Sequence, residues 1–317
     1  MSQTINPKTV FVCGVGRSGT SLLQSMLDAH PQISFTPETH FFRRYVALDR
    51  VRRMHERRGR EEFLLRLNED AEFARAEIPA DDLFTDDTQP LNLTQVYKNL
   101  LKTYSQRSGK PLVGDKDPRN IDFIEPLRRH FPNSVLLHII RDPRDVVLSR
   151  TKAKWSASRP WWMHALIYRA QFRRGQRDGK QCFGSDYLEV HYEDLIQSPQ
   201  AILTKICNTV NVEFDESMLS FSASAKRLVD PSEVSWKSET FGPLLKDNSE
   251  KWRAELSDWQ VQVIERVCED AFRSNKYERN TEHRPLSMTQ RSVLTATPIL
   301  RLFGDLGYAM KLRLRGS

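Results

Sequence analysis

A short apolar run that leads into a glycine loop constrains the fold of this chain more than any other stretch. VFVCGVG (10–16) is β-branched and apolar, and SLLQSMLDAH (21–30) has apolar residues at helical spacing. The turn between them carries Gly14 and Gly19 at the spacing of a phosphate-binding P-loop, but Thr20 stands where that pattern has lysine. The stretch therefore predicts a strand, an anion-binding loop and a helix. A ligand without a γ-phosphate to transfer would not need the P-loop lysine.

Two further strand–helix pairs follow. SVLLHIIRD (134–142) reads as a buried strand that continues into a helix, and DYLEVHYEDL (186–195) reads as a third strand before the helix QAILTKICNTV (200–210). Strands that alternate with helices indicate an α/β fold with a mainly parallel central sheet, here a P-loop-like three-layer fold. The interval between the first two strands has little strand character, and we expect a helical insertion at about 43–110 that is either a solvated face or part of a lid or acceptor pocket.

Composition narrows the class of protein. The chain has 317 residues, 39% of them hydrophobic, and its four cysteines show no disulfide or zinc spacing. The N-terminus lacks the pattern of a secretory signal, and no run is apolar enough to span a membrane, so we expect a cytoplasmic protein.

The basic charge is concentrated at the C-terminus. Six arginines and lysines and one aspartate lie in 284–317, which gives this segment +5 of the formal net charge of +7. We expect one domain over 1–283 and a basic amphipathic tail over 284–317. The tail fits either a membrane-surface helix or a helix packed on its own domain, and no signature of nucleic-acid binding accompanies it.

A second candidate anion site lies at the end of the strand at 134–142. Arg141 ends this strand and Ser149 lies two turns into the following helix. Ligands of open parallel sheets bind at the carboxyl ends of the strands, so both residues should meet the glycine loop. Arginine and serine could hold a second phosphate there, or Arg141 could instead pair with Asp142 or Asp145.

Three motifs carry a family resemblance. CGVGRSGTSLLQSMLDAHPQISFTPETHFF, GDKDPRNIDFIEPLRRHFPNSVLLHIIRDPRDVVLSR and VHYEDLIQSPQAI resemble, in order and spacing, the sulfotransferases that use 3′-phosphoadenosine 5′-phosphosulfate (PAPS). The resemblance covers about residues 10–211 and is strongest to the tyrosylprotein-sulfotransferase-like branch, whose loop reads R-S-G-T before L-D-A-H-P and E-T. It implies PAPS as co-substrate, adenosine 3′,5′-bisphosphate as product and no metal.

The resemblance also implies a donor site. The glycine loop would hold the 5′-phosphosulfate, Arg141 and Ser149 the 3′-phosphate, and a late loop would close over the donor. The candidate donor contacts are Gly16, Arg17, Ser18, Gly19, Thr20, Ser21, Arg141, Ser149, Tyr192, Ser235 and Lys237. Tyr192 could equally be a structural tyrosine at a strand end, and the late loop lacks the family's glycine-rich K-G-x-x-G run.

Four residues are the catalytic candidates. Direct transfer of a sulfuryl group needs a base for the acceptor hydroxyl and cations for the charge that develops on the leaving oxygen. The resemblance makes Glu38 the base and places Arg17 against the sulfuryl group and Lys116 at the leaving oxygen. His40 is the second candidate base, because it lies two residues after Glu38 and the unperturbed pKa of histidine suits a base. A local cap by an exposed Glu38 is the structural alternative.

Other classes of function remain open at this point. A P-loop kinase or NTPase would use the same glycine spacing, and a nucleotide- or membrane-binding protein without catalysis would use the loop and the basic tail. The acceptor could be a carbohydrate, a protein tyrosine or a small molecule. Trp155, Trp161 and Trp162 could stack on it or belong to the core.

Overall fold

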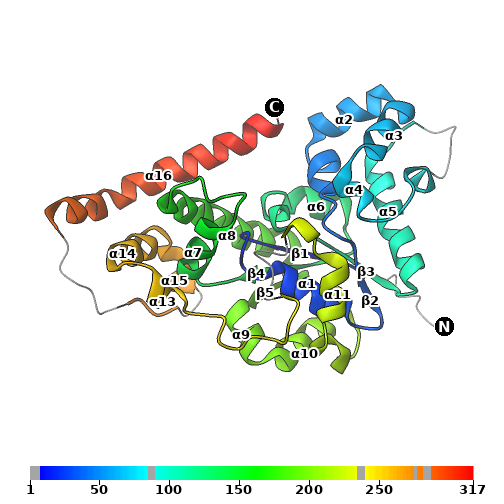
Figure 1. Ribbon diagram of the computed structural model, residues 1–317. Coiled ribbons are helices and arrows are strands. Elements are labelled where there is room, and N and C mark those ends of the chain that lie inside the picture. The colour runs from blue at the N-terminus through cyan, green and yellow to red at the C-terminus, as the bar shows by residue number, and fades with distance from the viewer. Residues whose placement is uncertain (1–7, 85–89, 234–239, 275–276, 281–286, 317) are drawn as a thin grey trace.

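The fold is built on a parallel sheet that is covered by helices on both faces. The computed structural model describes residues 8–84, 90–233, 240–274, 277–280 and 287–316. Its five strands pair in the order β2-β3-β1-β4-β5, and every pair is parallel (Figure 1). The strands are β1 (Thr9–Gly14), β2 (Ile33–Phe35), β3 (Leu112–Lys116), β4 (Ser134–Ile140) and β5 (Tyr187–His191). The predicted α/β fold with a mainly parallel sheet is confirmed.

The central strand β1 shows why the sheet is buried on both faces. Val10 and Val12 pack into one apolar cluster, whereas Phe11 and Cys13 point the other way and pack into a second cluster. Successive side chains of a strand alternate between faces, so a continuous apolar run needs a helical layer on each side.

Each face has its own helical layer. One layer comprises α1 (Thr20–Asp28), α9 (Tyr192–Gln197), α10 (Pro199–Val210) and α11 (Ser222–Leu228). The opposite layer includes α5 (Leu93–Ser108), α6 (Ile124–His130), α7 (Pro143–Lys152), α8 (Trp161–Phe183), α13 (Trp252–Glu255), α14 (Asp258–Val267) and α15 (Glu269–Ser274). The helices α1 and α10 lie on the side of the sheet away from α8 and α14 (Figure 1).

The interval between the first two predicted strands differs from the expectation. It holds α2 (Asp49–Arg58), α3 (Arg60–Asn68), α4 (Ala71–Ala74) and α5, but also the strands β2 and β3. Neither strand was predicted, because β2 has only three residues and β3 reads LVGDK, with a glycine and two charged residues. Within the expected helical insertion, the charged helices α2 and α3 separate at Gly59, which has φ 90°.

The strand predicted over 186–195 is too long. It ends at His191, and α9 begins at the next residue, Tyr192. The EDL sequence that follows supplies Glu193 and Asp194 to the first turn of α9, where carboxylates favour a helix start.

The C-terminal segment forms the long helix α16 (Met288–Gly316), which packs against α8 and α14 and reaches α2. Figure 1 shows it crossing the upper left of the molecule, with its end near α2. Among the helices described, none is both long and apolar enough to span a membrane.

Candidate active site

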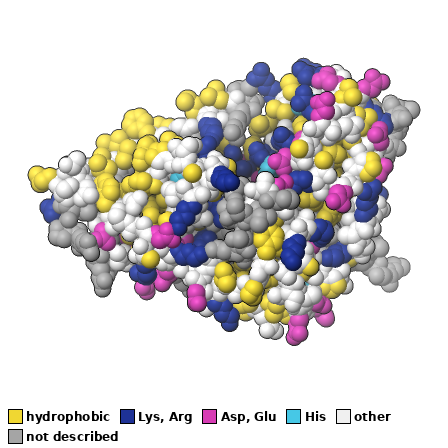
Figure 2. Space-filling view, viewed as in Figure 1, with side chains coloured by type: hydrophobic (Ala, Val, Ile, Leu, Met, Phe, Trp, Pro, Cys, Tyr) yellow, Lys and Arg dark blue, Asp and Glu magenta, His cyan; other side chains and the backbone are white. Residues whose placement is uncertain are grey.

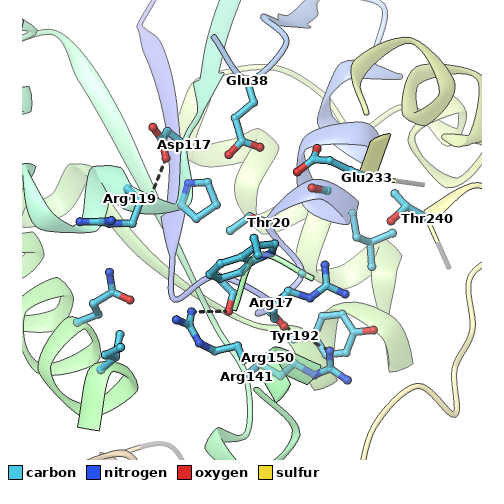
Figure 3. A pocket seen from close by; sticks show the side chains of 18 of the residues that line it. Arg17, Thr20, Glu38, Asp117, Arg119, Arg141, Arg150, Tyr192, Glu233 and Thr240 are labelled. Carbon is cyan, nitrogen blue, oxygen red and sulfur yellow. Dashed lines mark hydrogen bonds between the residues drawn. The ribbon is translucent and has the colours of Figure 1, made fainter. Parts of the chain in front are cut away.

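All five strands end at the same cavity, and each delivers a candidate site residue there. The glycine loop follows β1 and Glu38 lies three residues after β2; Lys116 is the last residue of β3. Arg141 follows β4, and Tyr192 follows β5. The cavity has a volume of about 390 Å³ and is lined by the glycine loop, Glu38, Arg141 and Tyr192, while Lys116 contacts Glu38 at its wall (Figure 3). The strand ends of a parallel sheet thus assemble groups that are far apart in the chain.

The glycine loop is shaped to admit an anion. Gly19 has φ 93°, and a Cβ built on it would lie 2.4 Å from Cδ2 of the Tyr192 ring. Gly19 is also the N-cap of α1 and offers no side chain to the first N–H groups of the helix. These N–H groups and the helix dipole favour a negatively charged ligand. Ser18 Oγ, buried in the loop, has no hydrogen-bond partner among the described residues.

Arg17 sits in a strained position within the loop. Its φ is 82°, in the left-handed region that L-residues other than Asn and Asp seldom occupy. Its Nε donates a hydrogen bond of 3.0 Å to Ser149 Oγ, which links the glycine loop to α7. The structure therefore brings together two predicted donor contacts that are 132 residues apart.

Arg141 is held by aromatic and carbonyl groups. Its guanidinium lies 4.3 Å from the centroid of the Tyr192 ring, and its Nη2 donates to the backbone oxygen of Asn248 at 2.9 Å. Asn248 Nδ2 in turn donates to Tyr192 Oη at 2.7 Å. Arg141 Nε is buried and makes no hydrogen bond to any described residue. The residues present thus leave donor capacity for a phosphate.

The carboxylates near Arg141 have other partners. Asp142 pairs with Arg144 at 2.6 Å, and Asp145 accepts from the backbone of Glu250 and Trp252. Asp145 lies 3.9 Å from Arg141 Nη2, at the limit of an ion pair. The alternative in which a neighbouring aspartate fully satisfies Arg141 therefore has little geometric support.

Glu38 and Lys116 form an ion pair in the cavity wall. The Lys116 ammonium contacts the Glu38 carboxylate and lies 3.4 Å from Ser21 Oγ at the start of α1. Lys116 is 2% exposed, whereas the Glu38 side chain is 13% exposed and lines the cavity. Glu38 is thus paired with Lys116 and only slightly exposed, unlike the exposed cap considered above. Lys116, the last residue of β3, brings an ammonium next to the start of α1.

His40 and Asp117 form a second polar group beside this pair. His40 Nδ1 lies 2.9 Å from Asp117 Oδ2 and 3.8 Å from Glu38 Oε1, and Arg43 Nε donates to Asp117 Oδ2 at 2.8 Å. Burial by itself would lower the pKa of His40, but the hydrogen bond to Asp117 and the charges of Asp117 and Glu38 raise it overall. Burial opposes the shift at Asp117 too, yet His40 and Arg43 hold the pKa of that carboxyl well below its usual value. A raised pKa lowers the neutral fraction of His40 that can accept a proton, and its ring nitrogen Nδ1 is already engaged by Asp117.

Glu38, His40 and Asp117 also have the composition of a metal site. One ligand atom from each lies within 4.8 Å of the others. Both carboxylates already face cations, since Lys116 contacts Glu38 and Arg43 contacts Asp117. These cations neutralise the charge that a divalent ion would need, so the residues fit a metal poorly.

The wall of the cavity carries more positive than negative charge. Among the residues that the structure describes, three acidic side chains line it, Glu38, Asp117 and Glu233. The cationic side chains that line it are Arg17, Arg43, Arg119, Arg141, Arg150, Arg159 and Lys311. A site with this excess suits a polyanionic ligand.

The structure places most of the predicted site residues together. Those that line the cavity are Gly16, Arg17, Gly19, Thr20, Ser21, Glu38, His40, Arg141 and Tyr192. Ser18, Lys116 and Ser149 lie immediately behind it, in contact with the loop or with Glu38. Ser235 and Lys237 lie outside the described residues.

Several cavity residues were not predicted from the sequence. Arg150 is buried at the end of α7, where its Nη1 donates to the Gly16 carbonyl at 3.4 Å. Tyr308 and Lys311 reach the cavity from α16, far along the chain. Of the cavity residues that were not predicted, only Asp117 could have been found from the sequence, because GDKDP places it beside the candidate Lys116.

Fold and site together define an α/β protein with an uncapped glycine loop at a cavity that is lined by cations. The family model described as the sulfotransferase family matches residues 7–216, and the chain belongs to this family. The resemblance to PAPS-dependent sulfotransferases is thereby confirmed.

Known proteins show the same relationship. The chain is 27% identical over 218 residues to protein-tyrosine sulfotransferase 1 of Danio rerio, covering 66% of this chain and 55% of that protein. It is 32% identical over 145 residues to protein-tyrosine sulfotransferase 1 of Homo sapiens, covering 46% of this chain and 34% of that protein. The match thus spans about half the length of the first relative and less of the second.

Solved structures agree on the fold. The sulfotransferase domain from the Synechococcus PCC 7002 olefin synthase aligns over 92% of this chain and 95% of that chain, with a TM-score of 0.57 and 22% identity. The sulfotransferase domain from the curacin biosynthetic pathway also aligns with a TM-score of 0.57, over 92% of this chain and 97% of that chain, at 17% identity.

Proposed function

We propose that this protein is a PAPS-dependent sulfotransferase that modifies a hydroxyl group. The observation that carries the proposal is the meeting, in one cavity, of two anion sites and a carboxylate. The uncapped glycine loop is one anion site, and Arg141 with Ser149 behind it is the other. Membership of the sulfotransferase family supports PAPS as co-substrate.

The residues present fit this co-substrate. Ser18 Oγ and Arg141 Nε are buried polar atoms without partners among the described residues, and the loop glycines leave space that a side chain would fill. The glycine loop would hold the 5′-phosphosulfate, which supplies an activated sulfuryl group, and Arg141 and Ser149 would hold the 3′-phosphate. The excess of cations in the cavity wall suits a ligand with four negative charges.

We assign the catalytic roles from the family resemblance, and the contacts of each side chain support them. Glu38 takes the proton from the acceptor hydroxyl as the new oxygen–sulfur bond forms and the bond to the phosphate oxygen breaks. Lys116, which contacts both Glu38 and Ser21, stabilises the charge on the departing oxygen, and Arg17 neutralises the sulfuryl oxygens. His40 Nδ1 lies 3.8 Å from Glu38 Oε1 and is held by Asp117, so we assign His40 to orienting Glu38.

The acceptor is a hydroxyl of a carbohydrate, a protein tyrosine or a small molecule. The curated relatives named above are protein-tyrosine sulfotransferases, so a tyrosine-containing peptide is the first acceptor to test. Among the described residues the four cysteines are free thiols, which supports the expected cytoplasmic location.

Calorimetric titration tests the donor site directly. The protein is titrated with adenosine 3′,5′-bisphosphate, adenosine 5′-monophosphate and ATP, first without metal and then with Mg²⁺. We expect clear preference for the bisphosphate without Mg²⁺, because only this ligand fills both anion sites. Preference for ATP with Mg²⁺ would assign the site to a P-loop kinase or NTPase instead.

A further inference from the structure

The C-terminal helix α16 has two different faces. The face toward the body is fixed by specific contacts: Arg301 pairs with Glu269 at 2.9 Å, and Tyr308 Oη donates to Asp122 at 2.6 Å. Asp305 on the same face pairs with Arg173 at 2.8 Å, and Thr297 is fully buried. These positions recur every three or four residues, as one face of a helix does. The helix is therefore docked on its own domain.

The opposite face of α16 is apolar and exposed. Ile299, Phe303, Leu306, Met310 and Leu314 also recur every three or four residues, and each is between 58% and 70% exposed. The described part of the chain has fifteen exposed large hydrophobic side chains, and nine of them lie on α16. Figure 2 shows these hydrophobic side chains gathered along the upper left of the molecule, over α16. A patch of this size marks an interaction surface.

The exposed charges described on α16 are cations, and they lie near the two ends of the helix. Asp305 is the one acidic residue of the helix, and it faces inward against Arg173. Arg291 and Arg313 are exposed cations of the helix. No acidic side chain of α16 therefore offsets them at the outer surface.

The neighbouring helix α2 extends the cationic surface. The C-terminal end of α16 lies against α2 (Figure 1). Arg50, Arg53 and Arg57 are exposed on α2 at the spacing of one helical face, and none forms an ion pair with any described residue. Met54 adds an exposed apolar side chain to the same helix. We call the stripe of α16 and these residues of α2 the α16–α2 platform.

We propose that the α16–α2 platform binds the surface of an anionic lipid bilayer. Partial insertion of Phe, Leu, Ile and Met side chains, with Lys and Arg at the headgroups, is the binding mode of interfacial amphipathic helices. Pairing of two copies of the chain through α16 would bring Arg291 and Arg313 of both copies together without a compensating acid on the helix. Anionic headgroups compensate these charges, which is why we assign the platform to lipid.

The same helix joins the platform to the cavity. Tyr308 and Lys311 line the cavity, while Met310 between them belongs to the exposed stripe. A protein bound through the platform would hold its cavity beside the lipid surface. The inference does not depend on the proposed chemistry, because binding to vesicles requires no donor and no acceptor.

Co-sedimentation of the full chain with vesicles tests the platform. The vesicles contain phosphatidylcholine alone or phosphatidylcholine with phosphatidylglycerol, at low and at high salt. We expect binding to the anionic vesicles that is weaker at high salt, and much weaker binding to phosphatidylcholine. Phe303→Ser with Leu306→Ser should reduce binding at least about tenfold, because two inserted side chains are lost.

Variants of α2 test the contribution of its arginines to the α16–α2 platform, and variants at exposed positions elsewhere are the controls. Arg53→Glu with Arg57→Glu should also reduce binding to anionic vesicles at least about tenfold, since each cation near such a surface contributes about a fivefold change. Leu219→Ser and Lys205→Glu, exposed positions away from the platform, should bind as wild type does. Circular dichroism of each variant checks folding.

Three results would overturn the proposal. One is failure of the wild type to bind anionic vesicles, and another is equal loss of binding in the control variants. The third is a dimer by sedimentation velocity that Phe303→Ser with Leu306→Ser dissociates, which would assign the stripe to a second copy of the chain. Because adenosine 3′,5′-bisphosphate binding is measured separately, failure here leaves the proposed sulfotransferase function untouched.

Discussion

Glu38 and Lys116 are 78 residues apart in the chain and form an ion pair at the ends of two adjacent strands. Lys116 is buried, so its charge is compensated by this carboxylate, and Ser21 lies next to the same ammonium. The pair therefore connects the candidate base Glu38, the cation proposed for the leaving oxygen and the first turn of α1.

Glu38→Gln should lower sulfuryl transfer by about 10²–10⁴-fold, the usual contribution of a general base. Binding of adenosine 3′,5′-bisphosphate should change little, because the amide keeps the size of the side chain and does not touch the second anion site. Turnover of PAPS with a tyrosine-containing peptide, or with another acceptor found by screening, measures the first effect, and calorimetry measures the second. If His40→Asn were the more damaging substitution, the base would be His40.

Arg141→Met should weaken binding of adenosine 3′,5′-bisphosphate by about 10–100-fold, as expected for loss of a charge-assisted contact to phosphate. Adenosine 5′-monophosphate has no 3′-phosphate, so its affinity serves as the internal control and should change much less. Calorimetry with both ligands checks this. Equal losses for the two nucleotides would mean that Arg141 supports the cavity rather than the 3′-phosphate.

Gly19→Ala should destabilise the protein by more than about 2 kcal/mol, since an alanine at positive φ is strained and its Cβ would collide with a buried ring. That Cβ would lie 2.4 Å from Tyr192 Cδ2. Gly109→Ala is the matched control: Gly109 has φ 66°, but no atom lies within 4 Å of its added Cβ. We expect it to cost only about 1 kcal/mol in urea unfolding. Equal costs at both positions would rule out the collision with Tyr192.

The His40–Asp117 contact should make stability depend on pH. The pKa of His40 is raised in the folded protein, so its contribution is fully present below its unfolded value of 6.5 and is lost as the pH rises through the folded value. The pKa of Asp117 is lowered in the folded protein, so its contribution to stability is present at higher pH. That contribution is lost only in strong acid, as the pH falls through the lowered pKa. Urea unfolding between about pH 5.5 and about pH 8.5 should therefore show a decline that Asp117→Asn reduces. An NMR titration of His40 that shows no upward shift would contradict this account.

Local patterns in the sequence predicted the parts of the site that are contiguous in the chain. The run 10–16 with its glycine loop, and Arg141 eight residues before Ser149, could be recognised because a strand, a turn and a helix each leave a short-range signal. Glu38 and Lys116 could be assigned only by resemblance. Their strands β2 and β3 are short or contain glycine and charged residues, so periodicity does not reveal them.

Local sequence also could not show which charges are compensated. Asp142 is not available to Arg141 because it forms an ion pair with Arg144. Arg144 also pairs with Glu265. The pKa of His40 is raised by Asp117, which follows β3 and lies beside the imidazole only in the folded sheet. Such partners are set by strand order, and strand order is a property of the packed sheet.

The sequence by itself determined three of the strands with the helices that follow them, the glycine loop and the amphipathic character of the tail over 284–317, because each depends on neighbouring residues. The tertiary structure decided that five strand ends meet at one cavity, that Lys116 lies beside Ser21 at the start of α1, and that α16 keeps its apolar stripe outside. The physical reason is that side chains far apart in the chain acquire partners only when the sheet and its helical layers pack. The packing of lowest free energy then fixes which charges and apolar faces remain available to ligands.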